Sequence, residues 1–225
     1  LLDKNIKKKI KIGSCTHSDI TVFSFHPVKI ITTGEGGMAL TNKLNIYEKL
    51  KLLRTHGITR ETKLMKKKSD GPWYYQQLDL GFNYRMNDIQ AALGYQQIKR
   101  IEDFIKRRNI IAKRYNDALK GLPINKQYQQ KDTYSAFHLY VITLNKKFSA
   151  KDHLNFFIKM RKKKIGVNLH YIPVHTQPYY QKIGFKKGDF PEAEDYYNKA
   201  ISLPMYPSLL PKEQNRVIES LKECL

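Results

Sequence analysis

A single lysine, Lys29, is the residue in this sequence best placed for covalent chemistry. It follows the strand-like run Ile20–Phe25, lies just after Pro27, and precedes the glycine-rich turn Gly34–Gly37. A lysine in such a place is partly removed from water, which disfavours the charged ammonium and leaves a more nucleophilic amine. Such an amine forms Schiff bases with carbonyl compounds, and the neighbouring glycines let the backbone approach a cofactor closely. The segment therefore predicts Schiff-base chemistry at Lys29.

The segments around Lys29 predict the elements that must hold it. The run Ile20–Phe25 is rich in β-branched and aromatic residues, which favour a strand. Residues Gly37–Thr41 predict a second short strand after the glycine-rich turn. Apolar residues at helical spacing predict a helix over Leu44–Arg54, and Gly57 is typical of a residue that follows a helix end. We therefore expect Lys29 to lie between two strands and ahead of a helix.

Downstream of this helix the chain passes from loop to regular elements. Residues 58–79 predict a long polar and aromatic loop, and Asn87 predicts the N-cap of a helix from Asp88 to about Leu119. We expect strands at Phe137–Leu144, Gly166–Tyr171 and Ile201–Pro204, and helices at Lys151–Lys163, Pro191–Ala200 and Pro211–Cys224. This alternation predicts a small α/β or α+β domain. The domain boundary is expected inside the long helix, near residue 108.

Two motifs together resemble a known family. Ser24–Lys29, followed by Gly34–Gly37, matches a Ser-Phe-x-x-x-Lys segment and its Gly-Glu-Gly-Gly turn, and Leu80–Gly94 matches a stretch that contains Gly-x-Asn-x-Arg. The sequence resembles the DegT/DnrJ/StrS sugar aminotransferases, which use pyridoxal 5'-phosphate (PLP) and have fold type I. The resemblance implies an α/β fold, the C-terminal part of a fold type I PLP-dependent transferase. Residues 1–108 would be a remnant of the PLP-binding large domain with the end of its mixed sheet, and residues 109–225 the small C-terminal α/β domain.

The resemblance also implies roles for single residues. Lys29 takes the place of the lysine that forms the Schiff base with PLP, and Ser24 that of the serine that binds the PLP phosphate. A hydroxyl donor suits a phosphate oxygen. Asn83 takes the place of the asparagine that reaches the phosphate in the neighbouring subunit, which implies a homodimer with shared active sites. The ordinary alternatives stay open, namely a surface lysine, a strand hydroxyl and a turn asparagine.

Weaker indications point to substrate contacts. Val167–His175 is similar to an element that lies near the substrate in the family, so Tyr171 and His175 are candidates for substrate binding. His26 could orient the substrate or be a plain loop histidine, and Arg85 could bind substrate or brace its own loop. No histidine of this region has a carboxylate or cysteine partner at metal-ligand spacing, so we expect no metal site.

The Schiff-base segment and the stretch Trp73–Arg85 are most similar to one branch of the family. That branch acts on a UDP-linked 4-keto-6-deoxy-N-acetyl-hexosamine in pseudaminic acid synthesis. The expected reaction therefore moves an amino group from L-glutamate to the 4-keto carbon of such a sugar. Lys29, rather than Glu35, is the expected base, because its freed amine already lies at the reacting carbon. Sugar dehydratases of the family carry histidine in place of this lysine, so Lys29 argues against that chemistry.

Features that the family carries upstream cannot be located in this sequence. By resemblance, these are a phosphate-binding turn, an aromatic ring against PLP and an aspartate at the pyridine nitrogen, which makes the cofactor an electron sink. The chain also begins at Leu1 rather than at a methionine. We therefore expect a fragment whose amino-terminal half is absent, and which alone binds PLP poorly and does not turn over. An inactive or regulatory remnant of such an enzyme is the alternative.

Composition sets the remaining expectations. The net charge of +21 comes from lysine runs such as Lys66–Lys68, which either bind an anionic partner or are simply solvated. The runs are scattered and no nucleic-acid-binding motif accompanies them, so we expect no nucleic acid partner, with a basic nucleic-acid-binding protein as the alternative. No apolar run is long enough to span a membrane, and Cys15 and Cys224 form no zinc or disulfide pattern. We therefore expect a cytoplasmic protein without membrane contact.

Overall fold

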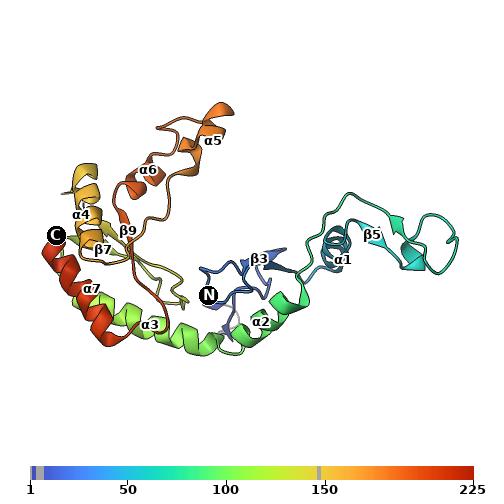
Figure 1. Ribbon diagram of the computed structural model, residues 1–225, viewed down its shortest axis with the longest axis horizontal. Coiled ribbons are helices and arrows are strands. Elements are labelled where there is room, and N and C mark those ends of the chain that lie inside the picture. Colours follow the sequence, from blue (N-terminus) through green and yellow to red (C-terminus); the bar gives the residue numbers. More distant parts are fainter. Residues whose placement is uncertain (1, 4–7, 146–147) are drawn as a thin grey trace. The chain divides into compact units, whose positions relative to one another are not determined.

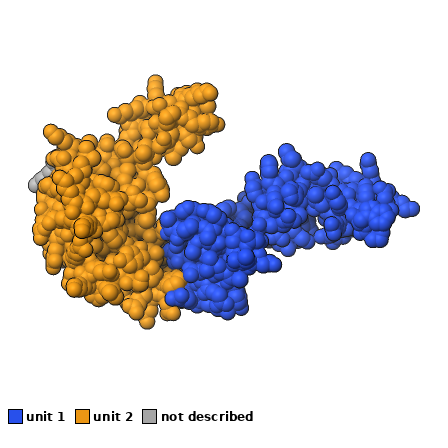
Figure 2. Space-filling model, in the orientation of Figure 1, with its two compact units in different colours: residues 1–101 blue, residues 102–225 orange. Residues whose placement is uncertain are grey.

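The structure, a computed structural model, describes residues 2–3, 8–145 and 148–225. It divides into two compact units, residues 1–101 and 102–225 (Figures 1 and 2). The division comes at the start of a helix, whereas the sequence suggested a boundary further along the same helix.

Arg108 ties helix α3 (Ile101–Ala118) to the second unit, which begins at Glu102 in the first turn of this helix. The Arg108 side chain is only 5% exposed. Its Nη1 atom donates hydrogen bonds to the carbonyl oxygens of Phe137, His138 and Met205, over 3.0, 3.1 and 3.1 Å. Two distant segments of the second unit therefore converge on the middle of this helix, and α3 belongs to that unit from its first turn.

The second unit is built on a three-stranded antiparallel sheet in the order β7-β8-β9 (Figure 1). In β8, the side chains of Tyr140, Ile142 and Leu144 are buried and the residues between them are half-buried, the alternation expected of a strand with one face on the core. Ile142 pairs with Ile201 of β9. Besides α3, the unit contains β7 (Ile124–Lys126), β8 (Tyr140–Leu144), α4 (Ala150–Lys162), the 3-10 helix η2 (Val174–Thr176), α5 (Pro178–Lys182), α6 (Pro191–Tyr197), β9 (Ala200–Leu203) and α7 (Pro211–Cys224).

Helices α3, α4 and α7 complete the core of the second unit. Each contributes a fully buried side chain, respectively Tyr115, Met160 and Leu221. Burial of a side chain such as Met160 or Leu221 contributes about 1.5–3 kcal/mol relative to exposure. Helix α4 begins at a capping box, in which Ser149 Oγ accepts from Asp152 N–H at 3.3 Å and Asp152 Oδ2 accepts from Ser149 N–H at 2.8 Å.

The first unit consists of short hairpins and two helices, and it has almost no core. Between residues 10 and 101, where burial is described, only Thr33, Gly57 and Thr59 are buried. Apolar side chains lie on the surface instead, for example Ile89, which is 84% exposed. Its elements are β1 (Leu2–Asp3), β2 (Lys8–Lys9), β3 (Thr21–Ser24), β4 (Gly37–Leu40), α1 (Leu44–Leu53), β5 (Ile58–Thr59), the 3-10 helix η1 (Thr62–Leu64), β6 (Gln76–Gln77) and α2 (Asp88–Ile98). The strands pair antiparallel in twos, and such ribbons are marginally stable alone.

The long helix expected from Asp88 to Leu119 is two helices, α2 and α3. The break lies at a tight turn in which Arg100 N–H donates to the Gln97 carbonyl at 3.1 Å, an i→i−3 bond that ends the α-helical ladder. The beginning of α2 is confirmed: Asn87 Oδ1 accepts from Gln90 N–H at 2.9 Å, and the Gln90 side chain accepts from Asn87 N–H at 3.2 Å.

The strand expected at Gly166–Tyr171 is only a single bridge between Asn168 and Ser202. The Asn168 side chain accepts the N–H of Leu169 at 2.8 Å, and this local bond takes a donor away from a continuing ladder. The opposite difference occurs in residues 58–79, expected as loop, where β5 and β6 pair as a small hairpin.

Two further element bounds shift for local reasons. The helix expected over Pro191–Ala200 ends at Tyr197, because Ala200 already pairs with β8 in the sheet. The strand expected from Phe137 starts later, because Phe137 has a φ of +45° and its carbonyl accepts from the buried arginine of α3. Helices α1 and α7 lie where the sequence predicted them.

Candidate functional site

Lys29 lies on the loop that joins β3 to β4. Phe25 N–H donates to the Gly36 carbonyl at 2.8 Å, and the Phe25 carbonyl accepts from Thr33 N–H at 3.0 Å, so the loop is closed at its base. Within the loop, Lys29 N–H donates to the His26 carbonyl at 2.9 Å in a tight turn. The Lys29 side chain is half-buried, and no hydrogen bond or ion pair within the described residues occupies its amine. The loop therefore presents a primary amine with no partner among the described residues, and a primary amine is the group that Schiff-base formation requires.

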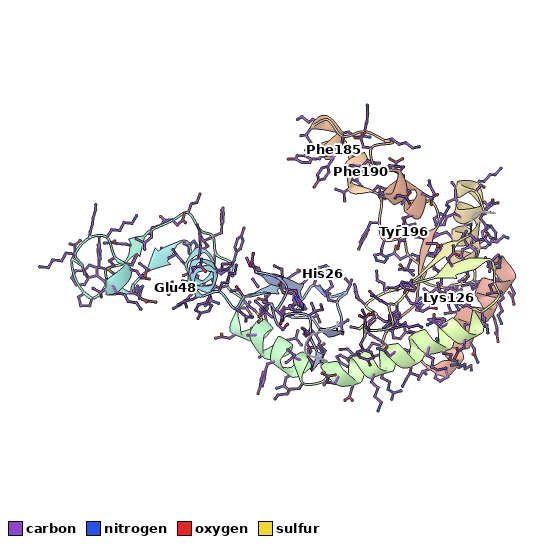
Figure 3. All side chains as sticks on the ribbon, turned by 180° about the vertical axis from the view of Figure 1, so that it is seen from behind. His26, Glu48, Lys126, Phe185, Phe190 and Tyr196 are labelled. Carbon is purple, nitrogen blue, oxygen red and sulfur yellow. The ribbon has the colours of Figure 1, made fainter. Side chains whose placement is uncertain are left out.

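Three polar side chains lie on the same loop and at its edge. Ser24 ends β3 and is exposed, and its Oγ accepts from His26 N–H at 3.4 Å. The His26 Nε2 atom lies 3.9 Å from Glu35 Oε1, and Figure 3 shows His26 projecting from this loop. Glu35 therefore faces the imidazole. The loop that carries Lys29 therefore also carries an imidazole, with a hydroxyl at its edge.

Residues 80–87, which we call the asparagine arm, carry Asn83 and Arg85. Both side chains are exposed, and Arg85 Nε donates to Asn83 Oδ1 at 3.0 Å. The arm is held closely against the end of α1, since a Cβ added at Gly81 would overlap the Leu53 carbonyl. Only glycine permits this approach. The close contact at Gly81 fixes the position of the arm, and with it the positions of the Asn83 amide and the Arg85 guanidinium.

The asparagine arm and the Lys29 loop meet within the first unit. A Cβ added at Gly36 would lie 2.9 Å from Cε of Met86, so these two residues are in close contact. Gly36 has a φ of +150°, a conformation that other residues rarely adopt. Five of the predicted site residues are thus carried on two touching segments: Lys29, Ser24, His26, Asn83 and Arg85.

The other two predicted residues, Tyr171 and His175, belong to the second unit. Tyr171 is 69% exposed, and its ring lies 4.6 Å from that of His170, measured between centroids. His175 is 7% exposed, and its Nε2 atom is 2.8 Å from Glu194 Oε1. The structure thus places Tyr171 where a ligand could reach it and His175 in a buried hydrogen-bonded pair.

Aromatic side chains surround His175. Its ring lies 4.8 Å from that of Phe190, which in turn lies 6.2 Å from the ring of Phe185 (Figure 3). Together with Val174 and Tyr180 these residues line a cavity of about 280 Å³. Glu194 could not be recognised from the sequence pattern, because it meets His175 only in the folded unit; the acidic first turn of α6 was the available signal.

The Glu194 carboxylate should make the second unit sensitive to acid. It accepts the Gly188 N–H at 2.6 Å and bonds His175, and these two contacts hold the pKa of Glu194 below its ordinary 4.5. A carboxylate whose pKa falls on folding contributes stability above its ordinary pKa, and that contribution is lost as the pH drops through the lowered value. We expect Glu194→Gln to flatten the fall of the unfolding free energy below pH 4.5, measured by urea denaturation.

Glu192→Gln is the matched control, since Glu192 is on the same helix, is exposed and makes no ion pair within the described residues. It should leave the acid dependence unchanged. Equal flattening in both variants would show that the effect is one of net charge and not of the Glu194 contacts.

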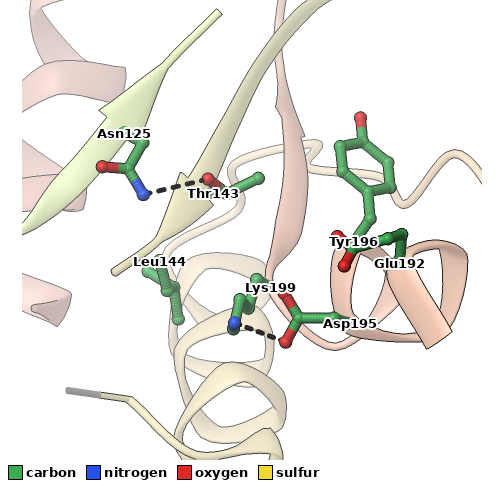
Figure 4. Close-up of a pocket in the computed structure, with 7 residues that line it drawn as sticks. All are labelled: Asn125, Thr143, Leu144, Glu192, Asp195, Tyr196 and Lys199. Atoms are coloured by element: carbon green, nitrogen blue, oxygen red, sulfur yellow. Dashed lines mark hydrogen bonds and ion pairs between the residues drawn. The ribbon is translucent and has the colours of Figure 1, made fainter. Parts of the chain in front are cut away.

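A second cavity, of about 310 Å³, lies elsewhere in this unit (Figure 4). Its polar groups are largely paired with one another. The Asn125 amide donates to Thr143 Oγ1 at 3.4 Å, and Lys199 forms an ion pair with Asp195. Leu144, Glu192 and Tyr196 complete the lining. Because its polar groups satisfy each other, this cavity presents few free groups to a ligand.

Residues 2–3, 8–145 and 148–225 contain neither a metal-binding cluster nor a membrane-spanning helix. Within these ranges no group of three or more histidine, cysteine, aspartate or glutamate side chains is arranged to hold a metal ion. No helix there has the length and apolar character that crossing a lipid bilayer requires.

The residues of the first unit fit an aldehyde cofactor that carries a phosphate. Such a group needs a primary amine for its aldehyde and neutral or cationic donors for its phosphate. Lys29 offers the amine, and the exposed Ser24 hydroxyl and Asn83 amide offer donors that nothing shields. These groups fit the aldehyde and the phosphate of PLP.

Comparisons with known proteins agree with this chemistry. The chain is 38% identical over 221 residues to the spore coat polysaccharide biosynthesis protein SpsC of Bacillus subtilis, covering 97% of this chain and 56% of SpsC. It is 32% identical over 219 residues to a UDP-4-amino-4,6-dideoxy-N-acetyl-beta-L-altrosamine transaminase of Campylobacter jejuni, covering 97% and 55%. The structure of Helicobacter pylori PseC, an aminotransferase involved in the biosynthesis of pseudoaminic acid, matches with a TM-score of 0.82 and 31% identity, covering 92% and 53%.

The chain thus spans about half the length of the relatives it matches. The structural match confirms the expected fold, that of part of a fold type I PLP-dependent transferase. The profile of the DegT/DnrJ/EryC1/StrS aminotransferases, which are PLP-dependent, matches residues 8–222. Chemistry, fold and sequence agree, and the chain belongs to the DegT/DnrJ/EryC1/StrS aminotransferase family.

Proposed function

We propose that this chain supplies the Schiff-base lysine of a PLP-dependent sugar aminotransferase. The reaction transfers an amino group from L-glutamate to the 4-keto carbon of a UDP-linked 4-keto-6-deoxy-N-acetyl-hexosamine, in the synthesis of pseudaminic acid or a related surface glycan. One observation carries the proposal: the half-buried and unpaired Lys29 amine, on a loop closed by its own hydrogen bonds.

Each site residue has a task in this proposal. Lys29 binds the aldehyde carbon, while Ser24 and, from a neighbouring subunit, Asn83 donate to the phosphate. When bound, PLP supplies the electron sink for the carbanion formed at the donor's Cα. The Lys29 amine, once free, would be the group that takes a proton from the donor's Cα. Glu35 is not assigned as the base, because its carboxylate faces His26, with Oε1 3.9 Å from the imidazole Nε2.

The remaining parts of the proposal concern assembly and substrate. A homodimer with shared sites needs Asn83 at the surface, and its side chain is exposed there with Arg85 bonded to it. His26, Arg85, Tyr171 and His175 are proposed substrate contacts, with His175 acting through the packing of its aromatic cavity. We propose that the reaction takes place in the cytoplasm. The UDP-linked substrate is supported by the name of the Campylobacter relative.

A fusion experiment tests the function. The chain is joined to the amino-terminal half of SpsC and, separately, to that of the Campylobacter transaminase, because it covers about half of each. We expect both fusions with PLP to convert L-glutamate to 2-oxoglutarate and to aminate the UDP-linked 4-keto sugar, read by mass spectrometry. The chain alone should bind PLP weakly and show no turnover.

The outcomes separate the parts of the proposal. If both fusions aminate a GDP-linked keto sugar and not the UDP-linked one, the sugar assignment is wrong while the enzyme class stands. If neither fusion releases 2-oxoglutarate, the aminotransferase proposal is contradicted. A stable adduct at Lys29, trapped by borohydride in the chain alone, would contradict the expectation of weak binding.

A further inference from the structure

Thr33 is the buried residue of the loop that carries Lys29. Its exposed fraction is 3%, and within residues 10–101 only Gly57 and Thr59 are also buried. Thr33 is therefore an exception in a unit with so little core, and its burial comes from contacts within the loop and with helix α2.

The polar groups of Thr33 hold both ends of the loop. Its N–H donates to the Phe25 carbonyl at 3.0 Å, which closes the loop base at the end of β3. Its Oγ1 donates to the Glu35 carbonyl at 2.6 Å, which holds the glycine-rich turn before β4. Thr32 adds a second bond to the Phe25 carbonyl, from its Oγ1 at 2.9 Å. The path of the backbone on either side of Lys29 therefore depends on this pair of threonines.

The methyl group of Thr33 contacts helix α2. A Cβ added at Gly94 would lie only 2.7 Å from Thr33 Cγ2, so the helix approaches the loop at the one position that lacks a side chain. Helix α2 begins directly after the asparagine arm, whose Met86 contacts Gly36. Thr33 thus connects the loop that carries Lys29 to helix α2, and this helix directly follows the arm that carries Asn83.

We infer that Thr33 is a positioning residue for Lys29, which locks the Schiff-base loop and couples it to helix α2 through Gly94. The inference rests on the proposed function, since it is the Lys29 amine that must be positioned. A misplacement of about 1 Å in a reacting group can reduce turnover by roughly a hundredfold. Threonine provides both contacts at this position: its hydroxyl bonds the Glu35 carbonyl, and its methyl group packs against Gly94.

The contact between Thr33 and Gly94 predicts that Gly94→Ala is unfavourable in this chain, although helix propensity alone favours alanine over glycine. Gly94→Ala should stabilise an isolated helix by about 1 kcal/mol. Here the new methyl group must push Thr33 away, because no Cβ is accommodated at 2.7 Å. Thr33→Ser removes the contacted methyl and keeps the hydroxyl, so it should make room for the alanine. The double variant should therefore recover what Gly94→Ala alone loses.

The test is a double-mutant cycle on the full chain, read by hydrogen exchange and by acylation of Lys29. Gly94→Ala should speed amide exchange over residues 25–36 by about tenfold and change the acylation rate of Lys29 relative to the exposed Lys43. Adding Thr33→Ser should return both rates to within about twofold of the unmutated chain. Gln96→Ala, an exposed change on the same helix, should alter neither rate.

The active fusion supplies a readout that a purely structural role would not move. Gly94→Ala should lower kcat by about tenfold with little change in KM for the sugar, and Thr33→Ser should restore kcat in the double variant. Additive losses in the cycle, or a faster exchange of the loop with unchanged kcat and acylation of Lys29, would overturn the inference. Failure of the unmutated fusion to transaminate contradicts the proposed function instead, while the exchange and acylation cycle, which needs no cofactor, still decides the role of Thr33.

Discussion

Lys29→Arg is expected to reduce transamination by the fusion enzyme roughly 1,000-fold or more, the scale seen when the central group of a catalytic unit is removed. A guanidinium stays protonated in proteins and cannot condense with an aldehyde, although it preserves the positive charge and most of the side-chain length. The amine of Lys29 has no partner among the described residues, so the exchange breaks no visible contact. Any loss therefore reports on chemistry at the nitrogen.

Steady-state amination and the absorbance of bound PLP measure this effect together. Lys43→Arg is the matched control: Lys43 is exposed and pairs with Asp19 at 2.5 Å, a contact that arginine retains. We expect the control to keep full activity and a borohydride-trapped adduct at Lys29. Turnover that survives undiminished in Lys29→Arg would remove the basis of the proposed function.

The second large effect is expected for stability. Arg108→Ala should lower the free energy of unfolding of the second unit by about 3 kcal/mol or more, because three carbonyl oxygens lose a charged donor inside a buried site. Burial already lowers the pKa of Arg108, so the three bonds are what offsets the cost of its desolvation. The truncation also leaves a cavity where the side chain lay.

Urea denaturation monitored by tyrosine fluorescence and circular dichroism gives this free energy. Arg107→Ala is the neighbouring control, since Arg107 is exposed and its loss should change stability by no more than about 0.5 kcal/mol. Similar values for the two variants would mean that the carbonyl contacts of Arg108 contribute little.

The sequence predicted an element correctly where the residues that form the pattern also make the contacts that stabilise the element. The strands on either side of Lys29 follow from β-branched residues and a glycine turn, and Asn87 with Gln90 forms the expected cap. The position of Lys29 on a loop between two strands was likewise predictable. These features depend on contacts within about a dozen residues, which is the range a sequence pattern describes.

Features that depend on distant contacts could not be predicted. Nothing in the sequence marks the turn at Arg100, where neither glycine nor proline occurs. Arg108 is a charged residue within an amphipathic helix, and only the convergence of three remote carbonyls explains its burial. For Thr33 one signal was available: Gly94 interrupts a good helix-forming stretch, and such a glycine often marks a close backbone approach.

The last helix of the second unit has a consequence for synthesis of the chain. Helix α7 contributes Val217, Ile218 and Leu221 to the core that also contains Met160. On a ribosome, β8 and α4 emerge well before α7, and their apolar faces lack this cover until it follows them out of the exit tunnel. Nascent chains at that stage expose surface that chaperones bind and that aggregates.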